Sequence, residues 1–159
     1  MRTVTIKEFL THEACPPAWL PYDLYLFRTD AADPVVFYVG QSEVAFARIW
    51  RHLHDGFKGR SLIGKFIRVN WPRSINFVID LYASPEASFV DLGHDRLAAE
   101  TRLIKQYHPC FNDTHNPTPT PLPALYKPPT ALVRYPRNLR GMIREAETAL
   151  RQVNNVTTW

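Results

Sequence analysis

The clearest pattern along the chain is an amphipathic stretch that follows an apolar run ending at Gly40. From residue 46 onward, apolar side chains recur at offsets of three, four, seven and eleven. The apolar face comprises Phe46, Ile49, Trp50, Leu53 and Phe57, and the polar face comprises Arg48, Arg51, His52 and Asp55. The pattern predicts a helix that packs on a core while it presents an arginine and a histidine one turn apart.

Two short β-rich runs precede this helix. Residues 22–27 and 35–40 are rich in tyrosine, phenylalanine and valine, and the polar segment between them carries aspartate and proline. This order favours a hairpin. We predict a register in which Tyr25 lies opposite Tyr38, so that both tyrosines project from the same side of the sheet.

The segments on either side of the hairpin and helix predict further elements. Ser61 begins a second, shorter helix that ends before a Trp-Pro pair, residues 74–83 alternate as a strand, and residues 94–107 form a helix that stops before a proline. Residues 5–11 favour a short opening helix, and the proline-punctuated segment 15–21 should run irregularly over the surface. We predict a mixed α/β fold in β-β-α-α-β-α order, with a three-stranded, mostly antiparallel sheet flanked by helices.

The C-terminal third of the chain changes in composition. Half of the 14 prolines lie between residues 117 and 136, which predicts an extended, polyproline-like strap. After it, apolar residues return at helical spacing, at Leu139, Met142, Ile143, Ala146, Leu150 and Val153. We expect an amphipathic helix over 137–159 that packs on the folded domain, on a second copy of the chain or on another protein.

Length and composition exclude several classes of protein. The 159 residues suit one domain, and 45% of them are hydrophobic, as in an ordinary globular protein. No apolar run approaches the roughly 20 residues that a membrane helix needs, and the N-terminus lacks the apolar core of a signal peptide. Cys15 and Cys110 have no partner at metal-ligand spacing, which favours free thiols. We therefore expect a cytoplasmic protein that does not enter a membrane.

The net charge of +4 is modest, but its distribution is uneven. Residues 48–73 contain seven lysines and arginines against one acid, and the C-terminal segment carries a second basic excess. Two positive surfaces suggest a polyanion as partner, nucleic acid first, although a solvated surface is an equally good interpretation of charge alone. The candidate contacts are Arg51, Lys58, Arg60, Lys65, Arg140 and Arg144.

Six polar residues occupy positions where these elements should meet. They are Tyr25 and Tyr38 on the paired strands, Arg48 and His52 on the helix that follows, Glu100 within the later helix and Asn112 after its end. Glu100 lies three positions after Leu97 and four before Ile104, so its carboxylate should sit on or beside the apolar stripe. A carboxylate there needs a partner, and a divalent metal ion is one good solution.

This ordered set resembles the GIY-YIG nuclease family. The family's first triplet appears as Asp23-Leu24-Tyr25, its second as Tyr38-Val39-Gly40, and Arg48 and His52 fall where the family's helix carries its arginine and often a histidine. Residues 99–112 are similar to the glutamate-to-asparagine segment of the N-terminal nuclease domain of the bacterial excision-repair incision subunit. The resemblance covers about residues 22–113, and we place a nuclease-like domain at 22–116 after an N-terminal segment, 1–21.

The resemblance implies a metal-dependent endonuclease that hydrolyses phosphodiester bonds in DNA, with RNA left open as a substrate. Arg48 would hold the phosphate, Glu100 would ligate one Mg²⁺ or Mn²⁺, and Asn112 would support the site by hydrogen bonding. The general base would be Tyr25, Tyr38 or His52, and the sequence does not choose among them.

Each of these residues also has an ordinary structural interpretation, such as a packed tyrosine, a surface histidine, a glutamate paired with Arg96 or a turn asparagine. Only their combination favours chemistry. Two other functions stay open: a nucleic-acid-binding module of the same fold without turnover, and a subunit recruited to a protein partner through the C-terminal helix. The biological role and the sequence specificity also stay open.

Overall fold

Four strands form one antiparallel sheet in the order β1-β4-β2-β3. The computed structural model describes residues 1–57, 60–130, 144 and 148. The strands are β1 (Arg2–Thr5), β2 (Leu24–Arg28), β3 (Val36–Gln41) and β4 (Val78–Tyr82). The α-helices are α1 (Ile6–Phe9), α2 (Ala45–Phe57), α3 (Leu62–Val69) and α4 (Arg96–Tyr107), with single 3₁₀ turns η1 (Pro17–Trp19), η2 (Arg73–Asn76) and η3 (Ala87–Leu92).

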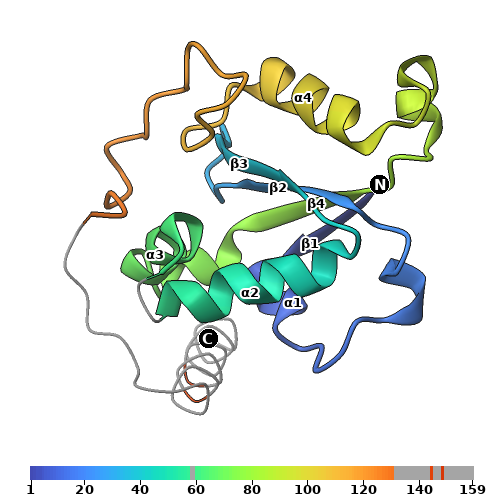
Figure 1. Cartoon of the computed structure of the whole chain (residues 1–159). Coiled ribbons are helices and arrows are strands. Elements are labelled where there is room, and N and C mark those ends of the chain that lie inside the picture. Colours follow the sequence, from blue (N-terminus) through green and yellow to red (C-terminus); the bar gives the residue numbers. More distant parts are fainter. Residues whose placement is uncertain (58–59, 131–143, 145–147, 149–159) are drawn as a thin grey trace.

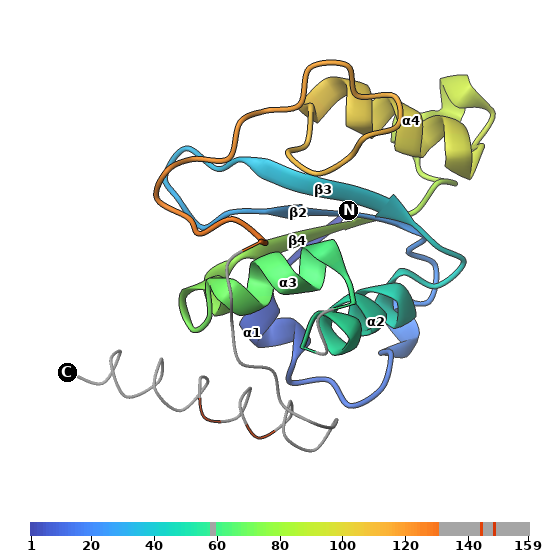
Figure 2. The ribbon, with the colours of Figure 1, turned by 60° about the vertical axis from the view of Figure 1, so that its left-hand side comes forward.

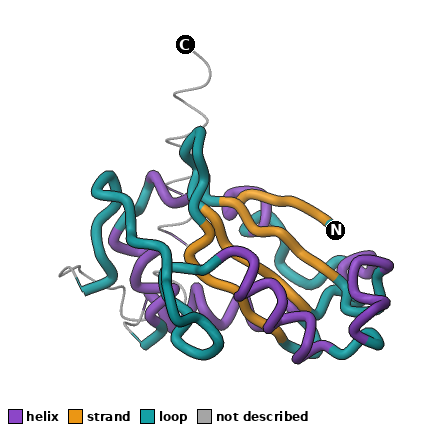
Figure 3. Tube along the Cα trace, turned by 90° about the horizontal axis from the view of Figure 1, so that it is seen from above, coloured by secondary structure: helices purple, strands orange, loops and turns teal. Residues whose placement is uncertain are grey.

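Helices cover both faces of this sheet, so the domain has three layers (Figure 1). On one face α1, α2 and α3 bury a large core that includes Tyr25, Phe27 and Phe66. On the other face α4 and η3 bury a smaller core around Leu26 and Leu103. Figure 3, which looks down on the α4 side, shows that helix lying over the strands. The mixed α/β class predicted from the sequence is confirmed.

The predicted count of three strands is wrong, because the N-terminus supplies a fourth. Strand β1 pairs antiparallel with β4 at the edge of the sheet, and Val4 enters the main core. Its four residues contain a single apolar side chain that is buried, so hydrophobic alternation alone does not reveal it. The helix predicted over residues 5–11 is the shorter α1. Thr5 belongs to β1 and is the N-cap of α1, where its side chain accepts a hydrogen bond from the backbone N–H of Glu8.

The predicted hairpin forms, but its register is shifted by two residues. Tyr25 lies opposite Gly40, not Tyr38, and Tyr38 lies opposite Phe27. A shift of two keeps every side chain on its face, so both tyrosines still project toward α2. The tyrosine ring opposite Gly40 explains the difference, because a side chain at that position would occupy the space that the ring fills.

The segment before β2 was predicted to run over the surface, and Trp19 contradicts this. Its side chain is buried in the main core, where its ring packs near Phe9 and Phe46. The surrounding prolines shape η1 and bring the indole inward. The prolines therefore predicted the irregular backbone of this segment correctly, but the predicted exposure of the segment is wrong at Trp19.

Capping residues mark the starts of α3 and α4 and the end of α4. Ser61 is the N-cap of α3 and accepts a hydrogen bond from Gly64, and Asp95 caps α4 in the same way through Ala98. Helix α4 ends at His108, whose left-handed backbone conformation terminates the helix just before Pro109.

Residues 117–130 form the described part of the proline-rich strap and contain no helix or strand. Figure 2 shows this orange segment passing from the α4 layer, beyond the hairpin end of the sheet, to the α3 layer. Tyr126 is its buried anchor. The predicted helix over 137–159 lies outside the described residues, apart from Arg144 and Thr148. Among the described helices, none has the length and apolar character needed to span a membrane.

Candidate functional site

The hydroxyl of Tyr25 marks the centre of the candidate site. The Tyr25 ring is buried on the α2 side of β2, directly over Gly40 of the neighbouring strand. A Cβ atom at residue 40 would lie 2.4 Å from both Cζ and the hydroxyl oxygen of Tyr25. Glycine is therefore required opposite the tyrosine if the ring is to lie flat over the strand.

His52 of α2 contacts this hydroxyl. Its Nε2 atom lies 2.9 Å from the Tyr25 hydroxyl oxygen, and its Nδ1 atom lies 3.0 Å from Oγ of Ser61. The imidazole also packs edge-on against the rings of Tyr25 and Tyr38, at centroid distances of 6.0 and 5.4 Å. Helix α2 thus delivers a histidine whose two ring nitrogens both have a hydroxyl partner.

Beside this histidine lies an open hollow of about 360 Å³, which we call the basic hollow. Its lining residues are Arg48, Arg51, His52, Arg60 and Ser61. The three arginines are exposed at its surface, and no negative charge occurs among the lining residues that the structure describes. Concentrated positive charge around a concave surface attracts anions, phosphate in particular.

The environment of the two tyrosine hydroxyls raises the pKa of both. Burial is the main cause for Tyr25, the neighbouring Tyr38 adds to it, and the nearby Arg48 guanidinium lowers the pKa in part. Burial also raises the pKa of Tyr38, and the Glu100 carboxylate raises it further, whereas Arg48 lowers it. Both phenols therefore remain protonated near neutral pH unless a proton acceptor takes part.

Glu100 reaches the same neighbourhood from α4. Its carboxylate is half-buried, and burial raises its pKa, with His115 and Arg96 acting in the opposite direction. The predicted apolar stripe around it is only partly correct, because Leu97 is 60% exposed and Ala99, Leu103 and Ile104 form the buried face of α4. Glu100 therefore lies at the border of the helix's buried face, close enough to influence both Tyr25 and Tyr38.

Asn112 binds the free edge of β3. Its Oδ1 accepts from the Val39 backbone N–H and its Nδ2 donates to the Val39 carbonyl, both at 2.9 Å. The backbone N–H groups of Cys110 and Phe111 also donate to β3 carbonyls. The side-chain amide replaces a neighbouring strand and fixes the backbone between Tyr38 and Gly40.

The residues predicted to contact nucleic acid lie in several different parts of the chain. Arg51 and Arg60 line the basic hollow, Lys65 lies one turn into α3, and Arg144 is exposed. Lys58 and Arg140 lie outside the described residues.

Two residues of this region had no functional prediction. Ser61 was predicted only to begin a helix, yet its hydroxyl also contacts His52. Asp23 stands where the resembled family has glycine, and its carboxylate accepts hydrogen bonds from the backbone N–H and the hydroxyl of Ser84. It therefore ties the start of β2 to the segment after β4. The contact of Asp23 joins segments that are far apart in the sequence, and the contact of Ser61 with His52 depends on how α3 packs on α2, so no local pattern could have shown them.

No cluster of three or more His, Cys, Asp or Glu side chains able to hold a metal ion occurs in the part of the chain that the structure describes. Glu100 alone fits a Mg²⁺ or Mn²⁺ ion that takes its other ligands from water and phosphate, since Mg²⁺ often binds through one or two carboxylates and a substrate phosphate. Comparisons with protein-family models, curated proteins and solved structures found no match to this chain.

Proposed function

We propose that this chain is a GIY-YIG-type endonuclease that hydrolyses phosphodiester bonds in DNA with the help of Mg²⁺ or Mn²⁺. One observation carries the proposal: a buried tyrosine hydroxyl contacts a histidine at the wall of a hollow lined by arginines. Proton-transfer groups and unbalanced positive charge are thus adjacent. Hydrolysis of a phosphodiester needs both, to activate water and to neutralise the charge on phosphorus.

The pair Tyr25 and His52 is the best candidate for activating water. A tyrosine that burial keeps protonated cannot act as a base alone. It can accept a proton from water if it passes its own to Nε2 of His52, which lies 2.9 Å away. Tyr38, half-buried on the same face, is then better placed to orient the water or the phosphate.

Arg48 and the other arginines of the hollow would hold the phosphate. Their guanidinium groups match phosphate oxygens in shape and carry charge at every relevant pH. Glu100 would hold the divalent ion. When bound, that ion would polarise the phosphate and stabilise the departing oxygen. Asn112 would act indirectly, by fixing the edge of β3 beside Tyr38.

A binding module without turnover is the second candidate, since the basic hollow would serve binding as well as cleavage. Conversion of supercoiled plasmid to nicked and linear forms in Mg²⁺ or Mn²⁺ separates the two. We expect cleavage by the wild type and a loss on the order of 100-fold or more for Glu100→Gln. Glu13→Gln, at an exposed position in the N-terminal segment, is the matched control. A wild type that binds plasmid but never nicks it would refute the nuclease proposal.

The stability of Glu100→Gln gives a readout that does not depend on activity. Burial raises the folded-state pKa of Glu100 above its unfolded value, so the folded protein binds this proton more tightly. The contribution of Glu100 to the free energy of unfolding is therefore fully present at a pH below its unfolded-state pKa. It is lost as the pH rises through the raised folded-state pKa. At neutral pH the charged carboxylate costs stability, and Glu100→Gln should unfold at a slightly higher denaturant concentration than the wild type. If Glu100→Gln has the same unfolding midpoint as Glu13→Gln at neutral pH and also at acidic pH, the charged carboxylate of Glu100 has no such cost.

A further inference from the structure

Ser61 links the start of α3 to the imidazole of His52. Its Oγ accepts a hydrogen bond from the backbone N–H of Gly64 at 3.2 Å, and it lies 3.0 Å from Nδ1 of His52. The opposite ring nitrogen, Nε2, contacts Tyr25. A hydroxyl thus holds each end of the ring, and the backbone of a helix terminus holds Ser61 itself.

The direction of the hydrogen bond between Tyr25 and His52 decides which ring nitrogen of His52 carries the proton. The Arg48 guanidinium lies close enough to the Tyr25 hydroxyl to lower its pKa, and a guanidinium can only donate hydrogen bonds. The proton path proposed for Tyr25 requires its O–H to point at Nε2 of His52, 2.9 Å away, which leaves the oxygen lone pairs to face Arg48. The proton of the neutral imidazole is then on Nδ1, and it is donated to Oγ of Ser61. That oxygen has two lone pairs, one for Gly64 and one for His52.

We propose that Ser61 is a positioning residue that holds His52 in the Nδ1–H tautomer, so that Nε2 can take the proton of Tyr25. This inference rests on the proposed nuclease function. In the step it serves, an O–H bond of water breaks, and the proton is transferred to the Tyr25 oxygen while the Tyr25 proton moves to Nε2. The resulting hydroxide forms a bond to phosphorus while the bond between phosphorus and the departing sugar oxygen breaks, and that oxygen takes a proton from solvent. His52 is then an imidazolium whose Nδ1–H remains bound by Ser61, and it returns the proton to solvent through the hollow that it lines.

A hydroxyl suits this position better than a carboxylate. An aspartate would also accept from Nδ1–H and would also cap α3. It would, however, add a negative charge to the wall of a hollow whose arginines are expected to bind phosphate. Serine orients the ring without weakening the attraction for the substrate.

The capping role of Ser61 has to be separated from its role toward His52. Alanine removes both the cap and the hydroxyl. Glycine removes the hydroxyl but weakens the cap far less than alanine does, and threonine keeps both. Thr5→Ala is the matched control, because Thr5 is also an N-cap and lies in β1, on the far edge of the sheet from β3.

Steady-state cleavage of an oligonucleotide duplex gives the first test. We expect Ser61→Ala and Ser61→Gly to lower kcat by about 10- to 100-fold with KM unchanged, as is common for groups that orient a functional histidine. Ser61→Thr and Thr5→Ala should keep the wild-type kcat. Ser61→Asp should keep kcat within a few-fold but raise KM. If Ser61→Gly turns over at the wild-type rate, Ser61 is a helix cap only and the proposal is wrong.

The tautomer itself gives a test that needs no activity. Nitrogen-15 NMR of the imidazoles distinguishes Nδ1–H from Nε2–H, and His52→Gln identifies the His52 signals among the six histidines. We expect Nδ1–H in the wild type and in Ser61→Thr, and a mixture of tautomers in Ser61→Gly. Nε2–H in the wild type, or an unchanged tautomer in Ser61→Gly, would overturn the proposal. A protein with the expected tautomers that never cleaves DNA would refute the nuclease function and leave the positioning role of Ser61 standing.

Discussion

The molecule contains two buried tyrosines whose surroundings look alike and differ in charge. Tyr25 is 1% exposed and Tyr126 is 4% exposed, and the hydroxyl of each makes a hydrogen bond of 2.9 Å. An arginine lies next to each ring. What differs is the partner of the hydroxyl, which is a histidine for Tyr25 and an aspartate for Tyr126.

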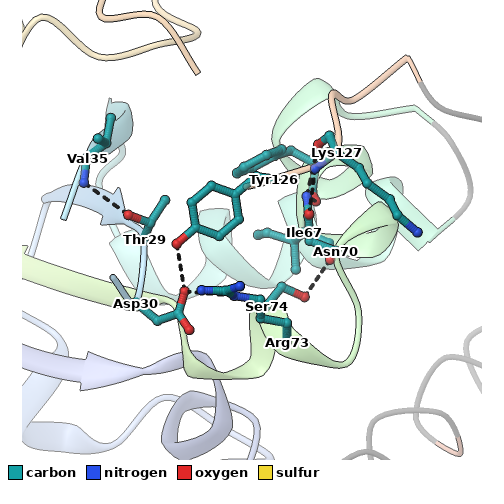
Figure 4. A network of polar contacts seen from close by, with 10 residues as sticks. Thr29, Asp30, Val35, Ile67, Asn70, Arg73, Ser74, Tyr126 and Lys127 are labelled. Carbon is teal, nitrogen blue, oxygen red and sulfur yellow. Dashed lines mark hydrogen bonds and ion pairs between the residues drawn. The ribbon is translucent and has the colours of Figure 1, made fainter. Parts of the chain in front are cut away.

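The surroundings of Tyr126 form a closed set of contacts, which we call the clasp (Figure 4). Tyr126 donates to Oδ1 of Asp30, Arg73 pairs with the same oxygen at 3.4 Å, and the Arg73 guanidinium lies 5.0 Å from the centre of the Tyr126 ring. Asn70 exchanges two hydrogen bonds with the backbone of Lys127. The charges of Asp30 and Arg73 cancel, so the clasp fastens the strap and needs no further partner.

The surroundings of Tyr25 are not balanced in this way. Three arginines line the basic hollow, no carboxylate occurs among its described lining residues, and Glu100 influences the tyrosines from the opposite layer. The excess positive charge among these described residues favours an anion as partner. The two tyrosines are the same residue type and are both buried. The charge balance around the hydroxyl is what distinguishes the candidate reactive site from the structural one.

The largest expected difference concerns the two arginines. Arg48→Ala should lower plasmid cleavage on the order of 100-fold or more, because its charge is needed most as the transition state forms. Arg73→Ala should leave cleavage unchanged and cost about 1 kcal/mol of unfolding free energy, from an exposed ion pair and one cation–π contact. Cleavage rates and urea midpoints of both variants test this, and loss of activity in Arg73→Ala would erase the distinction between the two regions.

Gly40→Ala should disturb one tyrosine and spare the other. The added methyl would overlap the Tyr25 ring, which is enclosed by neighbours including Phe27 and has little room to move. We expect a loss of about 1–3 kcal/mol in stability and a marked fall in cleavage, because the hydroxyl moves away from His52.

Gly93→Ala is the control for this substitution. Gly93 has φ +66 and nothing within 4 Å of an added Cβ, so alanine there costs stability through backbone strain alone. Its cleavage should match the wild type once both proteins are fully folded. Wild-type cleavage by Gly40→Ala would mean that the position of the Tyr25 ring is unimportant for chemistry.

The smallest expected effect concerns binding. Arg51→Ala should weaken affinity for duplex DNA and flatten the log–log salt dependence by roughly 0.9 for each phosphate that the side chain no longer neutralises, with kcat nearly unchanged. Arg102→Ala is the control, because Arg102 of α4 is already paired with Asp91 of η3. Binding measured at several salt concentrations decides the matter: equal slopes for Arg51→Ala and the wild type would remove Arg51 from the DNA-binding surface.

Periodicity and capping residues were sufficient to predict the longer elements of the fold. The apolar stripe of α2, the Ser61 cap and the proline after α4 act within a few residues of the chain, so the sequence displays them directly. Strand β1 and the burial of Trp19 were missed because both depend on contacts with distant segments. The hairpin register was missed because it depends on the fit of the Tyr25 ring over Gly40.

The candidate site shows the same division. The sequence indicated Tyr25, Arg48 and His52 as residue types in order, but not that Tyr25 and His52 share a hydrogen bond. It contained no sign that Ser61 contacts the same histidine or that Tyr126 enters the main core. These contacts arise only when α2, α3 and the strap pack on one face of the sheet. The roles of the predicted site residues in cleavage stay predictions.

Removal of one oxygen from each tyrosine distinguishes a reactive hydroxyl from a structural one. Tyr25→Phe and Tyr126→Phe both keep the ring and delete a buried hydroxyl, so each should cost about 1 kcal/mol of unfolding free energy. With stability matched in this way, kcat for duplex cleavage is the decisive measurement. We predict a fall on the order of 100-fold for Tyr25→Phe, because the proton path through His52 is cut, and no change for Tyr126→Phe. Equal kcat values in the two variants would show that the Tyr25 hydroxyl is structural, like that of the clasp.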